Sequence, residues 1–499
     1  MNKTLPFASI FLLLIFGCNT GEPIKFESPN GEKYRSEYHF TPKTGWMNDP
    51  NGMVYINGDY HLFYQYYPDS TVWGPMHWGH ATSKDMLRWE HKPIALYPDS
   101  LGYIFSGSAV FDLKNSSGLG TAGNPPYIAI YTYHDPVGAD SGSNTFQSQG
   151  IAFSLDEGKT WKPYDENPVL ESPGIADFRD PKVMNLPKED GRDNWIMTLA
   201  VKDEIHFYES SNLINWEKIG DFGKNIGAHG GVWECPDLLQ FTAPNGEEKW
   251  VLLVSLNPGG PQMGSATQYF IGDFMDGKFI PDDDLIRWLD YGPDNYAGVT
   301  WSNVPESDGR TLFMGWMSNW LYAQVVPTKT WRSAMTLPRE LSLFDVDGTL
   351  LVKSKPSEEL LSLRNQTFHI SQSSPLPGQA FELEAEIDSN TFSFKIENNS
   401  GEEVHFSKEN GLVTVDRRKA GKSNFHPDFA ASHSAPMSWE ANELRLFVDA
   451  NSIELFINDG ELVMTSLVFP ESPYTQIRIE NGLEDLKIHS LDPVMKSTD

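Results

Sequence analysis

The region between about residues 38 and 350 alternates short apolar and aromatic runs with clusters of turn-forming residues. Examples of such runs are Tyr60–Tyr66, Tyr127–Tyr133 and Trp250–Leu256. Short runs rich in aromatic and β-branched residues, bounded by Gly, Pro, Asn and Asp, are typical of β-strands. Helical periodicity is almost absent, and 41 Gly and 34 Pro supply many turns. The sequence therefore predicts an all-β region of many short strands.

A weak internal repeat runs through this region, at Ser83–Trp89, Ser154–Trp161 and Ser210–Trp216. Each copy begins with Ser, has Asp or Asn two residues later, and ends in Trp after a turn. A recurring all-β unit is typical of propeller blades. The alternative is a set of unrelated hairpin turns, since Ser, Asp and Gly favour turns in any case. The shared Trp at a nearly fixed offset favours the repeat.

The character of the sequence changes near residue 352. The stretch Pro356–Arg364 predicts a short capped helix. The alternating runs that follow predict strands, and Asn458–Gly460 predicts a hairpin turn. These strand-like runs include Phe381–Ile387, Leu444–Val448 and Ile453–Ile457. A second all-β domain, a sandwich, suits this spacing.

The first residues predict an export signal. Lys3 is basic, and Leu5–Phe16 is mostly apolar but too short to span a bilayer. Gly17 before Cys18 resembles a bacterial lipoprotein processing site, with the lipid on Cys18 and residues 1–17 removed. The alternative is a simple cleaved signal with an incidental Cys, since Phe16 is bulky where small residues are commoner. Polar residues 20–33 then predict a tether.

Net charge and cysteine count exclude several classes of function. The net charge is −30, from 38 basic and 68 acidic residues, which argues against binding to nucleic acid or, through a basic patch, to anionic lipid. A neutral substrate fits best, and membrane contact is expected only through the lipid on Cys18. The other cysteine is Cys235, so a Cys-based zinc site is excluded, as is an internal disulfide if Cys18 is acylated.

Three acidic motifs fall into register with the predicted blades. They are Asn48-Asp49-Pro50, Arg179-Asp180-Pro181 and Glu234-Cys235-Pro236. Equivalent positions of successive propeller blades surround one axis. The three carboxylates are therefore expected to converge at one end of the central channel.

Such a cluster suits cleavage of a glycosidic bond. Two carboxyl groups flank the bond, one attacking or activating water and the other protonating the departing oxygen. A third carboxylate stabilises the transition state, and crowding raises at least one pKa. Asn48 and Gln65 offer hydrogen bonds to sugar hydroxyls. Aromatic residues near the motifs suit the apolar faces of sugars: Trp46, Trp73, Phe105, Trp233 and Trp320.

The stretches Trp46–Gly52, Arg179–Pro181 and Trp233–Pro236 resemble the three signature motifs of glycoside hydrolase family 32. That family contains invertases, levanases and inulinases. Their order and spacing match, as do Phe105–Ser108 and Trp316–Glu340, and the resemblance covers about residues 38–490. It implies a five-bladed β-propeller followed by a C-terminal β-sandwich.

The resemblance also implies roles for the motif residues. Asp49 is the expected nucleophile, Glu234 the general acid and base, and Asp180 the transition-state stabiliser, with Arg179 beside it. The reaction retains configuration and needs no metal or cofactor. The expected substrates are levan or inulin, cleaved at terminal fructose, and also sucrose. The residues expected to line the fructose subsite are Asn48, Gln65, Trp73, Phe105, Ser106 and Trp320.

The predicted division of the chain is a signal segment at 1–18, a tether at 19–37, a propeller at 38–352, a linker at 353–366 and a sandwich at 367–499.

Three other functions are alternatives. A sialidase has turns like Ser154–Trp161, but it needs an arginine cluster and leaves the acidic motifs unexplained. A non-catalytic carbohydrate-binding lipoprotein is disfavoured because both predicted catalytic carboxylates are present. A fructosyltransferase shares the same residues and differs in how water is excluded.

Five further residues have open or structural interpretations. Cys235 is either a small buried apolar residue or a neighbour that tunes the acidity of Glu234. His77 and His80 have ligand-like spacing, but a structural role is favoured. Asp290 and Asp294 are expected to be structural turn residues near the last blade.

Overall fold

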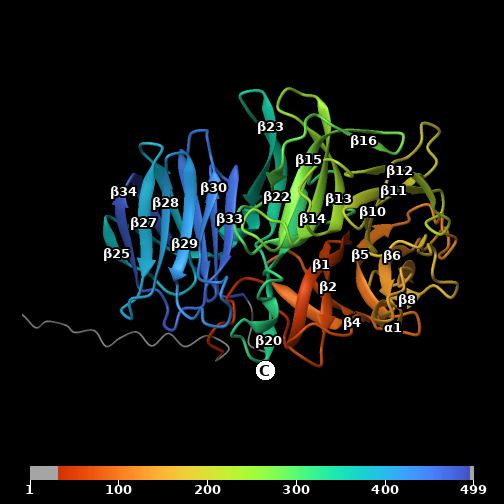
Figure 1. Cartoon of the computed structure of the whole chain (residues 1–499), viewed down its shortest axis with the longest axis horizontal. Coiled ribbons are helices and arrows are strands. Elements are labelled where there is room, and N and C mark those ends of the chain that lie inside the picture. Colours follow the sequence, from red (N-terminus) through yellow and green to blue (C-terminus); the bar gives the residue numbers. More distant parts are fainter. Residues whose placement is uncertain (1–31, 495–499) are drawn as a thin grey trace, which may run out of the picture.

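The computed structural model describes residues 32–494, which form two all-β domains side by side (Figure 1). The first contains five sheets of four or five strands, and the second contains two six-stranded sheets. The predicted fold class, a propeller followed by a sandwich, is confirmed. Residues 1–31, which include Cys18 and the predicted signal segment, lie outside the described residues.

The five sheets are propeller blades, and in the first three the strands follow in chain order. The first blade contains β1 (Gly45–Ile56), β2 (Asp59–Tyr67), β3 (His77–Ser83) and β4 (Trp89–Leu96). The second contains β5 (Tyr103–Phe111), β6 (Tyr127–His134), β7 (Gln147–Ser154) and β8 (Lys162–Pro163). The third contains β9 (Phe178–Asn185), β10 (Trp195–Val201), β11 (Glu204–Ser210) and β12 (Glu217–Phe222).

The last two blades carry short extra strands. The fourth contains β13 (Val232–Thr242), β14 (Glu248–Asn257), β15 (Ala266–Met275), β16 (Lys278–Pro281) and β17 (Arg287–Trp288). The fifth contains β18 (Tyr296–Thr300), β19 (Thr311–Met317), β21 (Ala334–Met335), β22 (Arg339–Val346) and β23 (Thr349–Pro356). Between β19 and β21, the strand β20 (Trp331–Arg332) pairs in parallel with β1. The last blade is thereby joined to the first, which closes the ring.

Neighbouring blades share apolar clusters. Between the first and second blades, Phe63, Trp78 and Tyr131 are almost wholly buried in one such cluster. Equivalent clusters join the second to the third, the third to the fourth, the fourth to the fifth and the fifth to the first. The core is therefore distributed around the ring, which leaves the channel end free for polar residues.

The sequence repeat lies at the same place in three blades. Its serines Ser83, Ser154 and Ser210 end β3, β7 and β11, so each repeat is the turn from the third strand to the fourth. Side-chain oxygens two residues later accept hydrogen bonds from backbone N–H groups of the turn, as seen for Asp85, Asp156 and Asn212. The predicted blade repeat is confirmed.

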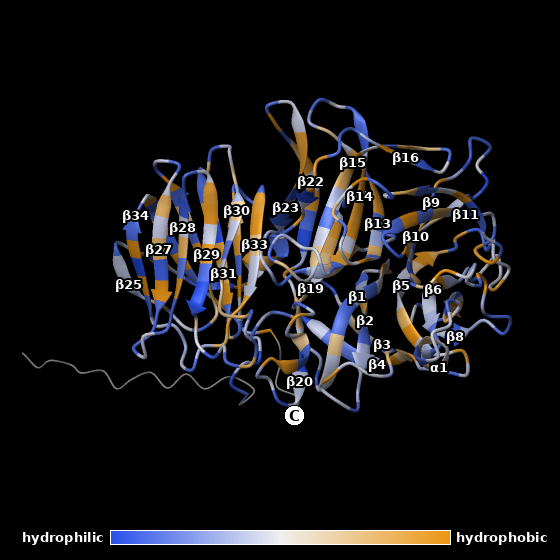
Figure 2. Ribbon diagram, viewed as in Figure 1, coloured by the Kyte–Doolittle hydropathy of each residue, from blue (hydrophilic) through white to orange (hydrophobic). Residues whose placement is uncertain are grey.

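The second domain is a sandwich of two sheets. The first sheet contains β24 (Arg364–His369), β35 (Leu483–Leu491), β26 (Phe381–Ile387), β31 (Glu443–Asp449), β32 (Ser452–Ile457) and β33 (Leu462–Leu467). The second contains β25 (Ser373–Pro375), β34 (Gln476–Asn481), β27 (Phe392–Glu397), β28 (Glu403–Glu409), β29 (Leu412–Lys419) and β30 (Ser432–Pro436). The strands β27, β28 and β29 alternate buried and more exposed residues, and apolar and polar residues are mixed along the sandwich strands in Figure 2.

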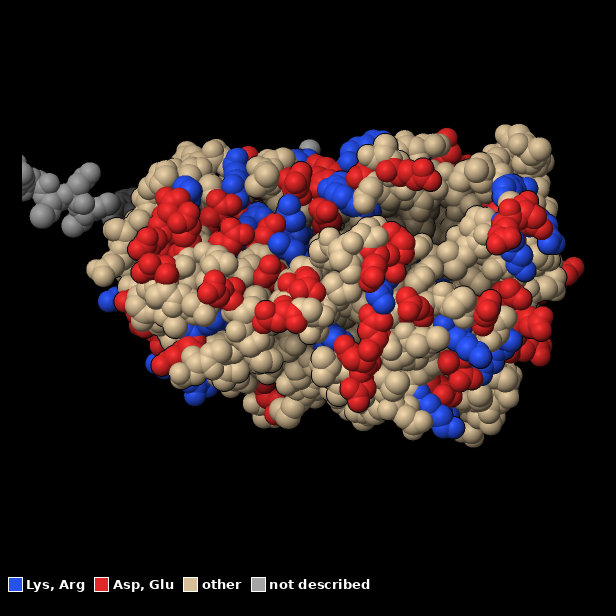
Figure 3. All heavy atoms as spheres, turned by 90° about the horizontal axis from the view of Figure 1, so that it is seen from above, with Lys and Arg blue, Asp and Glu red and all other residues tan. Residues whose placement is uncertain are grey.

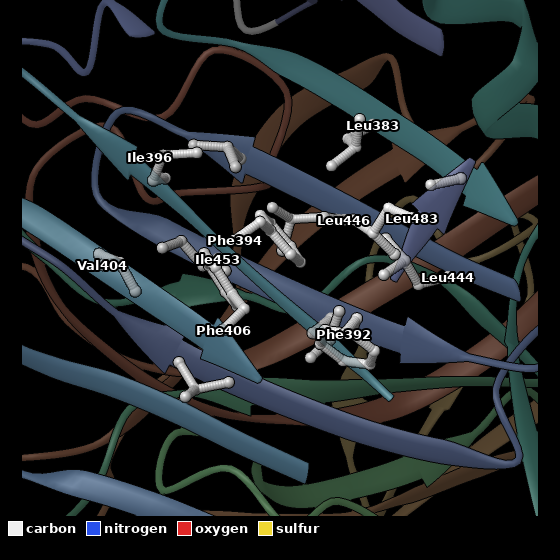
Figure 4. Packing of buried hydrophobic residues seen from close by; sticks show 14 of the residues in the cluster. Leu383, Phe392, Phe394, Ile396, Val404, Phe406, Leu444, Leu446, Ile453 and Leu483 are labelled. Carbon is white, nitrogen blue, oxygen red and sulfur yellow. The ribbon is translucent and has the colours of Figure 1, made fainter. Parts of the chain in front are cut away.

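Side chains from both sheets meet in the sandwich core (Figure 4). Leu383 and Leu446 come from the first sheet, and Phe394 and Phe406 from the second stack with ring centroids 4.7 Å apart. The predicted turn at Asn458–Gly460 joins β32 to β33, and Asn458 and Asp459 both have positive φ, as a tight hairpin requires.

Helix is scarce in the part of the chain that the structure describes. It consists of α1 (Pro136–Asp140) and the 3-10 helices η1 (Ala323–Val325) and η2 (Glu358–Leu363). The capped helix predicted at Pro356–Arg364 is thus a 3-10 helix, and its N-cap Ser357 makes no side-chain capping bond. The predicted linker, 353–366, covers the end of β23, all of η2 and the start of β24. No helix within residues 32–494 is long and apolar enough to cross a bilayer.

Buried ion pairs join the two domains. Asp290, in the turn before β18, binds Arg339 of β22 at 3.0 Å, and Arg339 also binds Glu454 of β32 at 2.5 Å. Asp294, in the same turn, binds Arg417 of β29 at 2.5 Å. Both aspartates are nearly inaccessible to solvent. The structural role expected of them is that of anchors between propeller and sandwich.

The segment that precedes β1 packs against the sandwich. The His39 ring bonds Asp449 at 2.8 Å and Glu454 at 2.9 Å. Tyr34 and Ser36, in the last residues of the predicted tether, are buried as well. On the surface, acidic and basic side chains are interspersed (Figure 3).

Candidate active site

The innermost strands of the five blades, β1, β5, β9, β13 and β18, each carry a β-bulge near their first residues. At each bulge two residues oppose one residue of the next strand. The bulged pairs are Asn48–Asp49, Phe105–Ser106, Asp180–Pro181, Cys235–Pro236 and Ala297–Gly298. A bulge bends the strand and re-aims its side chains. Five bulges around one axis therefore turn a set of side chains toward the same end of the channel.

Backbone conformation at the bulges explains the acidic-Pro motifs. Asp180 and Cys235 have positive φ values of 63° and 44°, and Pro181 and Pro236 follow them directly. Proline has no N–H to donate to the ladder, so within a sheet it is tolerated where a bulge interrupts the pairing. Each of these motifs thus supplies an acidic side chain, and its proline marks in the sequence the bulge that orients that side chain.

Asp49 is held by donors from two blades. Its Oδ1 accepts a hydrogen bond from Asn48 Nδ2 at 3.1 Å, and its Oδ2 accepts one from Ser106 Oγ at 2.8 Å. Trp46 Nε1 in turn donates to Asn48 Oδ1 at 2.7 Å, which fixes the amide. Burial, and then the charge of Glu234, raise the pKa of Asp49 to about 6 against these donors.

Glu234 accepts hydrogen bonds at both carboxyl oxygens. Arg179 donates to Oε1 from Nε at 3.1 Å and from Nη2 at 3.0 Å, and Tyr296 OH makes a short bond to Oε2. The arginine is itself held by Asp177 at 2.5 Å. These donors fix the direction in which Glu234 points.

Tyr296 is a site residue that the sequence did not reveal. It lies in β18 of the fifth blade, directly before the bulge at Ala297. Burial, and then the charge of Glu234, raise the pKa of Tyr296 well above its usual range, so it stays a donor. The fifth blade has no acidic-Pro motif, so a search for carboxylates passes over it; the available signal was its place in the innermost strand of the last blade.

Asp180 is the most enclosed of the three carboxyl groups. Its Oδ2 accepts the Cys235 backbone N–H at 3.1 Å and lies 4.0 Å from Arg179 Nε. Burial raises the pKa of Asp180 to about 7, with the charge of Arg179 opposing and those of Glu234 and Asp49 adding to the rise. The prediction that crowding raises at least one carboxyl pKa is confirmed, and it holds for both aspartates.

Two protein-family models match the sequence of this chain. The Glycosyl hydrolases family 32 N-terminal domain matches residues 39–354, and the family 32 C-terminal domain matches residues 351–492. The chain belongs to this family.

Relatives of this family 32 chain are similar over most of its length. It is 42% identical to a levanase of Bacillus subtilis (strain 168), over 98% of this chain and 74% of that protein. It is 36% identical to an extracellular exo-inulinase of Aspergillus awamori, over 90% of this chain and 92% of that protein.

Solved structures of other proteins are also similar to this chain. An exo-inulinase from Aspergillus awamori is similar with a TM-score of 0.84 and 34% identity, over 92% of this chain and 99% of that one. A β-fructofuranosidase from Schwanniomyces occidentalis, complexed with fructosyl-erythritol, gives a TM-score of 0.81 and 31% identity, over 94% and 100%. The chain is a glycoside hydrolase, and the sialidase and non-catalytic alternatives find no support.

Of the predicted subsite residues of this family 32 hydrolase, Asn48, Ser106 and Arg179 bond directly to the carboxyl groups. Gln65 of β2 opposes the bulge at Asn48–Asp49, and its buried Nε2 has no hydrogen-bond partner among the described residues. An unsatisfied buried donor is costly unless a ligand or water accepts from it. Gln65 is therefore ready to donate to a bound hydroxyl group.

The aromatic residues predicted near the site differ in how exposed they are. Trp73 is 36% exposed and meets the edge of Phe105, with ring centroids 6.1 Å apart. Trp320 is partly exposed and stacks on Trp46 at 5.7 Å. Trp46 and Trp233 are completely buried, so the expectation that both offer a face to sugar is wrong. Trp46 instead supports Asn48 and Trp320 from behind.

Cys235 lies between the two aspartates. Its Sγ is 3.7 Å from Asp49 Oδ2 and 3.6 Å from Asp180 Oδ2, and it is buried. Its side-chain contacts are therefore with the aspartates, whereas Glu234 is held by Arg179 and Tyr296. The histidines singled out by their spacing lie elsewhere: His80 bonds the ring of His61, and His77 bonds the Pro75 carbonyl.

Proposed function

We propose that this family 32 enzyme is a retaining exo-β-fructosidase, which releases terminal β-D-fructofuranosyl residues from levan or inulin and also hydrolyses sucrose. One observation carries the proposal: Asp49 and Glu234, on different blades, are held by separate sets of donors, and each shares a neighbour with Asp180, which is Cys235 for Asp49 and Arg179 for Glu234. The similarity to proteins named levanase and exo-inulinase supports the substrate class.

The proposed reaction has two steps. First, the Asp49 carboxylate attacks the anomeric carbon of fructose while Glu234 gives its proton to the departing oxygen, so the glycosidic bond breaks and a fructosyl-enzyme ester forms. Then Glu234 takes a proton from water, the water oxygen attacks the anomeric carbon, and the ester bond to Asp49 breaks. Two inversions retain the configuration.

Asp180 and its neighbours hold the sugar during both steps. A carboxylate that accepts hydrogen bonds from ring hydroxyls stabilises a positively charged transition state more than the ground state. Gln65 and Asn48 are proposed to bind hydroxyl groups, with Ser106 and Arg179 beside the carboxylates. The walls of the subsite are Trp73, Phe105 and Trp320.

Product analysis tests this function. Purified protein that lacks residues 1–18 is incubated separately with levan, inulin and sucrose. Fructose alone, released linearly from one polymer, is the expected result, and it names the linkage. A ladder of oligosaccharides would contradict exo-action, and new, longer saccharides formed from sucrose would favour transfer over hydrolysis. No product from any of the three would overturn the proposed activity.

We also propose that the chain is exported and carries a lipid on Cys18. The apolar run Leu5–Phe16 followed by Gly17-Cys18 supports this, as does the similarity to proteins named extracellular exo-inulinase. In a bacterial host fed labelled fatty acid, the natural chain should incorporate label and sediment with membranes, and Cys18→Ala should do neither. Label retained in Cys18→Ala would contradict the anchor.

A further inference from the structure

The face opposite the candidate active site has a pocket of its own. The innermost strands begin at the active-site end, and β1 and β5 reach the opposite face with Tyr55 and Phe111 near their last residues. A pocket of about 400 Å³ lies there, between the first and second blades. It is lined by the aromatic residues Tyr55, Phe111 and Tyr127 and by the amides Asn57, Asn124 and Asn303. This volume falls within the range of small-molecule sites.

The aromatic side chains form a fixed apolar wall. Phe111 and Tyr127 are stacked, with ring centroids 4.5 Å apart and an interplanar angle of 23°. Tyr127 is almost buried and supports Phe111, whose ring is partly exposed, as is that of Tyr55. Rigid, partly exposed rings of this kind bind the apolar faces of sugar rings at little entropic cost.

The three amides are oriented by the protein itself. Asn57 Nδ2 donates to Glu157 Oε1 at 2.9 Å, and Asn124 Nδ2 donates to the Leu155 carbonyl at 3.0 Å. Asn303 Nδ2 donates to the Tyr55 carbonyl at 2.7 Å. All three asparagines are exposed, and each bond uses one of the two N–H groups of Nδ2, so the second N–H and the side-chain oxygen remain for a ligand. The pocket therefore presents both donors and acceptors for sugar hydroxyl groups.

The charges and the extent of the pocket limit the kind of ligand that it can hold. Among the described residues that line the pocket there is Glu157 but no Lys or Arg, so an anionic ligand is disfavoured in a chain of net charge −30. A second cavity of about 310 Å³ shares Phe111 and Asn303 with it and continues toward the central channel, where Lys182 binds Asp237 at 3.0 Å. The two cavities adjoin at Phe111 and Asn303 and together form one depression on this face.

We propose that this depression is a second carbohydrate-binding site, which holds a neutral oligosaccharide segment of the polymer that the active site hydrolyses. The identity of the ligand as fructan rests on the proposed function. A second site raises the local concentration of polymer chains around the enzyme, so it lowers KM for long substrates. It has no effect on sucrose, which is too short to occupy both faces.

Calorimetry with levan and inulin oligosaccharides tests the site. The Asp49→Asn variant serves as the parent, so that the ligand is not consumed, and it should bind at two places per chain. Adding Phe111→Ala removes the wall and should leave one. Adding Leu155→Arg, at a position that is 43% exposed, fills the pocket without disturbing the core and should do the same. Phe368→Ala, an exposed phenylalanine of the sandwich, is the matched control and should leave both.

Kinetics of the active enzyme separate the two proposals. Leu155→Arg should raise KM for the polymer several-fold and leave kcat and KM for sucrose unchanged. One binding event in the Asp49→Asn parent, or two that both pocket variants retain, would overturn the second site while leaving the proposed function intact. Absence of turnover by the natural enzyme on every fructan and on sucrose would count against the proposed function instead.

Discussion

At the scale of single residues, the acidity of Asp49 is set by opposing effects. Burial and Glu234 raise its pKa to about 6, whereas the donors Asn48 and Ser106 favour its charged form. Because the proposed attack needs the Asp49 carboxylate and the proposed transition state needs that of Asp180, whose pKa burial raises to about 7, kcat/KM should fall as pH drops from about 7 to about 6. Ser106→Ala removes one donor, so the acidic limb of the pH profile should move to higher pH. A limb that stays in place, or moves lower, would show that another group titrates there.

Tyr296 is expected to position Glu234. Tyr296→Phe keeps the ring but removes the O–H that donates to Glu234 Oε2. Hydrogen bonds to charged groups contribute about 1.5–3 kcal/mol, so kcat/KM should fall by roughly ten- to a hundredfold. The measurement is steady-state kinetics across pH, where the profile should change shape as well as height. Tyr208→Phe, a buried tyrosine of β11, is the control. Equal kinetics of Tyr296→Phe and Tyr208→Phe would show that Tyr296 does not position Glu234.

Asp180 is expected to act mainly in the transition state. Asp180→Asn keeps the volume and the acceptor oxygen but removes the charge that faces the developing cation. We expect kcat to fall by on the order of a hundredfold or more, with KM changed only a few-fold. Steady-state kinetics on sucrose check this. A large rise in KM with kcat unchanged would instead assign Asp180 to simple substrate binding.

At the scale of elements, the repeated turns are predicted to stabilise the blade edges. Asp156 accepts hydrogen bonds from Ser154 Oγ at 2.8 Å and from the Thr160 backbone at 2.9 Å. Asp156→Ala removes these bonds and should cost about 1–2 kcal/mol of unfolding free energy, measured by urea denaturation. Asp165→Ala loses only an exposed ion pair with Lys162 and should cost less than about 0.5 kcal/mol. Equal losses of unfolding free energy in Asp156→Ala and Asp165→Ala would show that the turn bonds do not stabilise the blade edge more than an exposed ion pair does.

Some features of these elements could be predicted from the sequence, and others could not. The repeat and the acidic-Pro motifs predicted the blades and three carboxylates, because turn chemistry and bulge-tolerant prolines are local signals. Tyr296 and the parallel pairing of β20 with β1 were missed, since both depend on contacts between distant segments. The burial of Trp46 and Trp233 was missed for the same reason: a tryptophan beside a motif does not reveal which way its strand faces.

At the scale of the whole molecule, the two domains are joined by charged groups that water does not reach. Arg339 of the propeller pairs with Glu454 of the sandwich, Arg417 of the sandwich pairs with Asp294 of the propeller, and both arginines are buried. Removing one partner of such a pair leaves an uncompensated buried charge and typically costs about 3–5 kcal/mol. The domain arrangement is therefore sensitive to the protonation of the groups at this junction, which include His39.

Stability should fall as pH rises past neutral because of His39. Burial alone would lower its pKa, but hydrogen bonds to Asp449 and Glu454 raise the pKa to about 9 from an unfolded value of 6.5. Its contribution is complete below pH 6.5 and is lost as pH rises through about 9, a difference of about 3 kcal/mol. Urea denaturation at pH 6, 7.5 and 9 should show this loss in the natural protein. His39→Gln should be less stable at pH 6 yet lose less on going to pH 9. Because other groups titrate in the same range, the difference in unfolding free energy between the two proteins is the quantity to follow, and it should shrink as pH rises. A constant difference would mean that folding leaves the pKa of His39 unchanged, and a difference that grows with pH would mean that His39 is neutral in the folded state.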